Sequence, residues 1–202
     1  QDVVKFLHYR LSRSDEINGW PRDSMVKANA RSAVAYTRRR AHWTQLLLER
    51  ANRTLYSHAN HVPGPLDRSN LSVEHIMPQT LNDVWKEDLE SWGVSDPNSL
   101  HEEKLHVLGN LTLTRVNSDL SNKRFSEKTP LIGDDLLRLN TQIAELNEWT
   151  GSAIDERSAR LASAICTAFI GPLSDDELAH CDALFGENPA EENEGEDESE
   201  EE

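Results

Sequence analysis

The spacing of hydrophobic positions changes along the chain and predicts where helices and strands lie. From Asp23 to about Tyr56 no Pro or Gly interrupts the sequence, and apolar residues recur at helical spacing. We therefore expect one long helix, or two helices with a bend, that serves mainly as scaffold. The expected buried stripe consists of Val34, Trp43, Leu47, Leu48 and Leu55.

The middle of the chain alternates apolar and polar residues, which is the period of a half-buried strand. We expect strands over residues 71–76, 105–108 and 111–114, with a turn at Gly109-Asn110 joining the last two. A polar stretch that holds two tryptophans separates the first strand from the second. The sequence from Arg115 to about Lys128 is compatible with a helix. The expected order is therefore strand, long loop, strand, turn, strand, helix.

The C-terminal part returns to helical spacing. Gly133-Asp134-Asp135 is expected to cap a helix, and a second amphipathic helix is expected over residues 154–169. Ser174 begins a capping box that predicts a short helix ending near Gly186. The apolar row of the first of these helices is Leu136, Leu139, Ile143 and Leu146. Residues 187–202 are too charged to form a core, and we expect them to be disordered.

These elements predict an α+β fold in which a mostly helical domain surrounds a small ββα unit. We expect four segments along the chain. They are a helical scaffold over residues 1–70, the ββα core over residues 71–128, C-terminal helices that pack on it over residues 129–186, and the disordered acidic tail over residues 187–202.

Length and composition narrow the class of protein. The 202 residues suit one domain with a tail. No apolar run approaches the roughly 18 residues of a membrane helix, so a membrane partner is not expected. Cys166 and Cys181 lack the pairing of a zinc site or a disulfide framework, which favours a reducing compartment, the cytoplasm. Because the chain opens at Gln1 without a signal peptide, we expect it to be a piece of a longer protein.

The net charge of −15 is concentrated at one end of the chain. Fourteen of the 36 acidic residues lie in residues 174–202, where no Lys or Arg occurs. The preceding residues are almost neutral, and residues 1–53 hold 11 basic against 5 acidic residues, including the run Arg38-Arg39-Arg40. This run could attract phosphates or form an ordinary solvated face, and the sequence leaves both interpretations open.

Candidate chemistry gathers between residues 74 and 128. Hydrolysis of a phosphodiester needs a base for water, a cation at the leaving oxygen and positive charge near the phosphate. His75 is a candidate base because imidazole titrates near neutrality, and Glu74 and Asn117 offer the hard oxygens that Mg²⁺ or Mn²⁺ prefers. The candidate phosphate contacts are Arg115, Lys123, Arg124 and Lys128. A Glu-His pair on a strand is also common as a plain surface pair, so composition alone does not decide.

Three motifs in this region resemble an HNH nuclease. They are Glu74-His75-Ile76-Met77-Pro78-Gln79, Leu108-Gly109-Asn110-Leu111-Thr112-Leu113, and the segment from Asn117 to Lys128 with its Ser121-Asn122-Lys123 and Phe125. Together these motifs resemble the C-terminal nuclease domain of the GmrSD, SspE and BrxU type of modification-dependent phage-restriction enzymes. It covers residues 71–128, which would then form a ββα-metal core.

The resemblance implies a role for each motif residue. His75 would be the general base, Asn110 would brace the ββα-metal loop, and Asn117 would contact the metal or the scissile phosphate. Glu74 occupies the place where many HNH nucleases have a metal-binding Asp.

The interval between the two motif asparagines is shorter than is usual for the family, because Asn117 follows Asn110 by seven residues. Asp119 and Asn122 are therefore rivals of Asn117 as the ligand from the helix. His106, just before the Gly-Asn turn, could lie near the metal or be an ordinary core histidine.

The resemblance also implies an activity and partners. We expect one Mg²⁺ or Mn²⁺ ion and nicking of duplex DNA with little sequence specificity, since phosphate contacts carry no sequence information. The expected partners are phage DNA, an N-terminal nucleotide-hydrolysing sensor domain in the full-length protein and a second copy of the chain. The main alternative is a catalytically inactive DNA-binding or assembly module. A helical scaffold whose acidic tail mimics DNA ranks last.

Overall fold

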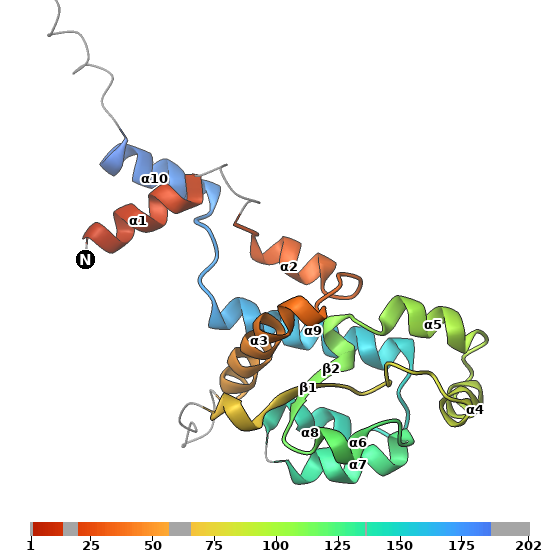
Figure 1. Cartoon of the computed structure of the whole chain (residues 1–202). Helices are drawn as coiled ribbons and strands as arrows, with labels where there is room; N and C mark the ends of the chain where they lie inside the picture. The colour runs from red at the N-terminus through yellow and green to blue at the C-terminus, as the bar shows by residue number, and fades with distance from the viewer. Residues whose placement is uncertain (1, 14–19, 57–65, 136, 187–202) are drawn as a thin grey trace, which may run out of the picture. The chain divides into compact units, whose positions relative to one another are not determined.

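The computed structural model describes residues 2–13, 20–56, 66–135 and 137–186. Within these ranges the chain forms ten α-helices, two short strands and three 3-10 turns, so the α+β expectation is confirmed (Figure 1). The chain divides into two compact units. One consists of residues 23–170, and the other combines residues 1–22 with residues 171–202.

The sheet of the larger unit has two antiparallel strands, β1 (Ser72–His75) and β2 (Leu111–Thr114). Ser72 pairs with Thr114, and His75 pairs with Leu111. All residues of β2 are buried, because Leu111 and Leu113 enter the core while the threonines face the other side. The strands expected over residues 71–76 and 111–114 therefore exist, and they pair with each other.

The expected strand over residues 105–108 and its hairpin are wrong. Val107 forms a single bridge with Val34, and the chain then turns through η3 (Leu108–Asn110) into β2. The turn packs against a helix: the Gly109 N–H donates to Ser158 Oγ at 2.9 Å, and a side chain at Gly109 would collide with backbone there. This Gly-Asn pair is thus a close-packing site, which its composition cannot distinguish from a hairpin turn.

The expected long loop after β1 contains two helices, α4 (Asp83–Ser91) and α5 (Pro97–Lys104). Each begins at an N-cap whose side chain accepts backbone N–H groups, Asn82 for α4 and Asp96 for α5. These capping residues were the local signal for helices that the polar composition concealed.

The expected helix from Asp23 to Tyr56 is broken in its middle. It becomes α2 (Asp23–Asn29), the 3-10 turn η1 (Arg38–Arg40) and α3 (Ala41–Thr54). The segment between α2 and η1 is extended because Ala35 N–H donates to the carbonyl of His106 at 2.8 Å. Tertiary pairing therefore overrides helix propensity here. Two residues of the expected buried stripe, Val34 and Trp43, are exposed.

The expected helix over residues 115–128 is also divided, into α6 (Asn117–Leu120) and α7 (Phe125–Asp134). Ser121 ends α6 with a φ of 37°, a left-handed conformation that a helix cannot continue. Gly133-Asp134-Asp135 lies at the end of α7 rather than at the start of a helix. The next helix is α8 (Arg138–Ala144), and Leu136 of the expected apolar row lies outside the described residues.

Helix α9 (Gly151–Ala168) confirms the second predicted amphipathic helix and packs against α3 and η3. Two groups of buried hydrophobic side chains fill the larger unit. The first includes Leu48, Ala51, Leu111, Leu113, Leu161 and Ile165, and the second includes Ile76, Met77, Trp85, Leu120, Phe125, Trp149 and Ile154. Together they enclose the short sheet, so β1 carries its polar side chains into a dry environment.

The smaller unit contains α1 (Asp2–Arg13) and α10 (Asp175–Phe185). The Tyr9 hydroxyl donates to Asp182 at 2.8 Å, and the Phe6 and Phe185 rings meet edge to face. The predicted capping box at Ser174 is present. The expected disorder of residues 187–202 concerns a segment outside the described residues. Among the described helices, none combines the length and the apolar character that a membrane span requires.

Candidate active site

His75 lies at the end of β1 with its ring almost fully buried, at 3% exposure. Its Nε2 is 3.1 Å from Nδ1 of His106, and its ring meets the ring of Tyr36 edge to face at a centroid distance of 4.8 Å. Burial, reinforced by the nearby His106 and Lys128, lowers the pKa of His75 to about 3. The imidazole is therefore uncharged at neutral pH, and while the ring stays buried it accepts a proton only weakly.

Glu74 forms a buried ion pair with Lys128. Lys128 Nζ is 2.7 Å from Glu74 Oε1 and donates to the carbonyl of His75 at 3.0 Å. Burial raises the pKa of Glu74, and the neighbouring ammonium opposes this rise. Lys128 is fully buried and therefore presents no surface to DNA. The expectation that Lys128 contacts DNA does not hold in this structure, in which it is the internal counter-ion of Glu74.

Asn110 braces the segment that follows β1. Its Oδ1 accepts from Met77 N at 2.8 Å and from Trp149 Nε1 at 3.0 Å. Its Nδ2 donates to the carbonyls of Met77 and Leu105. Because Asn110 is fully buried and its polar atoms are satisfied within the protein, it holds the backbone in shape.

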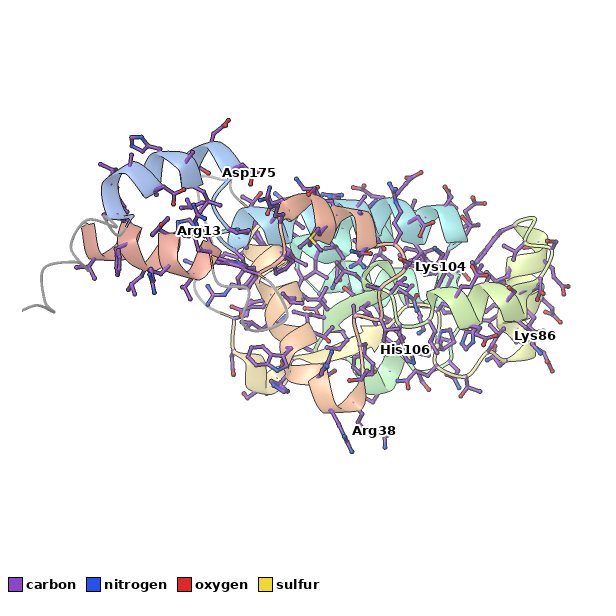
Figure 2. All side chains as sticks on the ribbon, turned by 90° about the horizontal axis from the view of Figure 1, so that it is seen from above. Arg13, Arg38, Lys86, Lys104, His106 and Asp175 are labelled. Atoms are coloured by element: carbon purple, nitrogen blue, oxygen red, sulfur yellow. The ribbon has the colours of Figure 1, made fainter. Side chains whose placement is uncertain are left out.

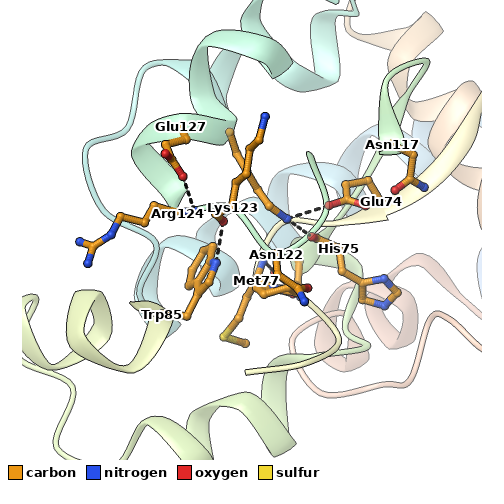
Figure 3. A network of polar contacts seen from close by, with 12 residues as sticks. Glu74, His75, Met77, Trp85, Asn117, Asn122, Lys123, Arg124 and Glu127 are labelled. Atoms are coloured by element: carbon orange, nitrogen blue, oxygen red, sulfur yellow. Dashed lines mark hydrogen bonds and ion pairs between the residues drawn. The ribbon is translucent and has the colours of Figure 1, made fainter. Parts of the chain in front are cut away.

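Asn117 is fixed against β1 from the start of α6. Its Nδ2 donates to Ser72 Oγ at 3.0 Å and to the Val73 carbonyl at 3.3 Å. Ser72 and Glu74 point to the same face of the strand, since alternate residues share a face. Asn117 and Glu74 are thus brought to one side of β1, and Figure 3 shows Asn117 beside Glu74.

The imidazole of His75 lies on the other side of β1 (Figure 3). The recorded partners of its ring are Tyr36 and His106, and neither Glu74 nor Asn117 is among them. The motif residues therefore flank the end of the strand. They do not converge on a single face.

The rivals of Asn117 are less well placed. Asp119 and Asn122 are both exposed. The recorded contact of Asn122 is made by its backbone carbonyl, which accepts from Asn82 Nδ2 at 3.1 Å. Of the three candidate ligands on this segment, Asn117 alone is held against the strand that carries Glu74 and His75.

Two of the other expected phosphate contacts carry charges that carboxylates already neutralise. Arg115 pairs with Asp135, and Arg124 pairs with Asp88 at 2.7 Å and with Glu87 at 3.0 Å. Lys123 is exposed and forms no ion pair within the part of the chain that the structure describes. Its carbonyl accepts from Trp85 Nε1 at 2.8 Å (Figure 3), so its position is fixed while its ammonium faces solvent.

A family model described as GmrSD restriction endonucleases, C-terminal domain, matches residues 20–164. The chain belongs to this family. The matched range contains both strands and every motif residue, so the resemblance drawn from residues 71–128 is confirmed and extends well beyond them. No curated protein and no solved structure matches the chain. This GmrSD C-terminal domain is accordingly a restriction endonuclease region.

Glu74 and Asn117 carry the types of oxygen atom that a hard divalent cation takes as ligands. Glu74 supplies a carboxylate, of which Lys128 holds one oxygen, and Asn117 supplies an amide oxygen on the same face. Mg²⁺ is commonly bound by one or two carboxylates and keeps several waters, so two protein oxygens are sufficient. Among the described residues no group of three or more His, Cys, Asp or Glu side chains could hold a metal.

Tyr36 and Arg157 have no signal in the local sequence. His106, which the sequence singles out as either a neighbour of the metal or a core histidine, has its Nδ1 3.1 Å from Nε2 of His75. Tyr36 and His106 cover His75 from distant segments. Arg157 of α9 is fully buried and donates to the carbonyls of Gly109 and Leu111 at 2.7 and 2.6 Å. An arginine on an amphipathic helix usually faces solvent. Only the fold shows that it fixes the turn before β2.

Proposed function

We propose that this GmrSD C-terminal domain is a metal-dependent HNH endonuclease that nicks duplex DNA with little sequence specificity, as the effector of an anti-phage restriction protein. The observation that carries the proposal is the uncharged imidazole of His75 next to Glu74, with Asn117 tied to the same strand. In a chain of a restriction endonuclease family, this trio supplies a base and oxygen donors around one short strand.

Because the backbone of β1 separates His75 from Glu74 and Asn117, a phosphate that meets all three must lie beyond the end of the strand, and the proposed reaction there is an in-line displacement. In that reaction the attacking water and the leaving oxygen lie on opposite sides of the phosphorus. His75 would take the proton of the water from one side, while Glu74 and Asn117 would hold a divalent ion on the other. Such an ion supplies positive charge that stabilises the leaving 3′ oxygen. Lys128 orients the Glu74 carboxylate and balances its negative charge.

The base must be uncovered before it can act. A general base has to come within about 3 Å of the proton that it abstracts, directly or through one water. In the structure Nε2 of His75 faces His106, and Tyr36 packs against the ring. We therefore include in the proposal a small displacement of Tyr36 or His106 when DNA binds, which opens His75 to water.

One base and one donor set cut one strand in each event. Double-strand breaks would then come from repeated nicks or from two copies of the chain. An N-terminal nucleotide-hydrolysing domain of the larger protein would select the modified phage DNA. The sensor domain and its choice of phage DNA are proposed from the resemblance to modification-dependent restriction enzymes, as is a cytoplasmic location.

A catalytically inactive DNA-binding or assembly module is the second candidate. The observation that favours it is the burial of His75 beneath Tyr36 and His106. The two functions make opposite predictions for DNA cleavage.

Incubation with supercoiled plasmid and Mg²⁺ or Mn²⁺ tests the proposal. We expect relaxed circles first and linear DNA later, because independent nicks must accumulate on both strands before a break forms. EDTA is expected to abolish both products, and agarose gels of a time course measure them. A chain that binds the plasmid but yields no relaxed DNA with either metal would establish the inactive module instead.

A further inference from the structure

An unpaired basic turn lies close to the candidate active site. Arg38, Arg39 and Arg40 form η1, and all three are exposed. Neither η1 nor the first turn of α3 contains an acidic residue, and the recorded ion pairs between described residues include none of these arginines. Figure 2 shows Arg38 projecting outward from the ribbon. These three charges are thus uncompensated, unlike those of Arg115 and Arg124.

The backbone ties this turn to the cover of His75. Tyr36, which contacts the rings of His75 and His106, precedes Arg38 by two residues, so their Cα atoms are within about 7 Å of each other. Thr44 Oγ1 donates to the carbonyl of Ala35 at 2.6 Å and to that of Arg40 at 3.3 Å. The arginines therefore stand at a fixed place next to Tyr36.

We propose that the turn formed by Arg38, Arg39 and Arg40 binds the phosphate backbone of duplex DNA and places a phosphate at His75. The inference rests on the proposed nuclease function and names a DNA-binding surface outside the HNH motifs. Arginine suits this task because its guanidinium can donate two parallel hydrogen bonds to a phosphate. Contacts to phosphates alone are consistent with weak sequence specificity. Since the turn adjoins Tyr36, DNA bound there is positioned to shift the cover of His75.

DNA binding by the full chain in EDTA separates this surface from catalysis. The probe is a fluorescent duplex, and its Kd is measured by anisotropy over a series of salt concentrations. Replacing all three arginines by Ala should lower the slope of log Kd against log salt by about 2–3, since each phosphate contact contributes about 0.9. At about 0.1 M salt the affinity should fall at least 10-fold.

A matched triple variant removes the same charge elsewhere. Arg53, Lys86 and Arg160 lie on other helices, and their replacement by Ala should leave the slope within about 1 of the parent. Thermal unfolding verifies that both triple variants are folded. Nicking assays should show a raised KM for plasmid in the first triple variant and an unchanged KM in the second.

The outcomes distinguish the two proposals. Parent-like DNA binding by the Arg38, Arg39 and Arg40 variant overturns the DNA surface even if the parent cuts plasmid. An equal loss in the matched variant also overturns it, because net charge alone would then explain binding. If the parent never cuts DNA but the Arg38, Arg39 and Arg40 variant alone loses DNA binding, the DNA-binding surface is supported and the nuclease function is rejected.

Discussion

Replacement of His75 by Ala is expected to slow plasmid nicking by about 10²- to 10⁴-fold, the contribution typical of a positioned general base. Burial lowers the pKa of His75 and weakens it as a base, so the proposed uncovering of the ring on DNA binding is needed to raise its pKa toward the ordinary value. Nicking rates at saturating plasmid measure the effect. His180→Ala is the matched control, because His180 is an exposed histidine on α10.

Slow nicking by His75→Ala could come from lost packing instead of a lost base, because the His75 ring packs against Tyr36 and His106. His75→Gln keeps most of the volume of the side chain but is a much weaker base. We expect both variants to bind DNA like the parent and both to be slow. Nicking by His75→Ala at the rate of the parent would exclude His75 as the base.

Lys128→Met is expected to lower the free energy of unfolding by about 3–5 kcal/mol, since Glu74 would remain buried without its counter-ion. Urea denaturation measures the change. Lys123→Met is the matched control, and because Lys123 is exposed its effect should stay within about 0.5 kcal/mol. Lys128→Met should also lose nicking activity, because Glu74 would lose the contact that orients its carboxylate.

The double variant Glu74→Gln with Lys128→Met completes a thermodynamic cycle. Removal of both charges should restore part of the stability, because the destabilisation comes from leaving one charge unpaired. A loss below about 1 kcal/mol for Lys128→Met alone would show that Glu74 finds another partner or takes up a proton.

Much of the fold is encoded locally and could be predicted. The alternating residues of β1 and β2, the apolar row of α9 and the capping box of α10 each determine their element within a few residues. The failures share one cause, which is contact with a distant segment. The helix expected through Ala35 is opened by the carbonyl of His106, and the turn at Gly109 is held by α9.

The residues of the candidate site also divide into those that local sequence predicts and those that only distant contacts reveal. Glu74, His75 and Asn117 could be selected because their motif is local and its residue types match the chemistry. The sequence predicts that Lys128 contacts DNA because a lysine on a polar segment usually faces solvent, and its actual partner Glu74 is 54 positions away. Tyr36 is also distant in sequence from His75 and lies outside the motif. No spacing rule could connect it to the base that it covers.

The central claim is that a divalent ion and the His75 imidazole lie on opposite sides of a DNA phosphate at the end of β1. A crystal structure of the protein with Mn²⁺ and a nicked duplex, with the ion located by anomalous scattering, tests it most directly. The account predicts Mn²⁺ bound to Glu74 and Asn117, with the phosphate between the ion and the His75 ring. An ion bound away from both residues, or a phosphate beyond reach of His75, would contradict it.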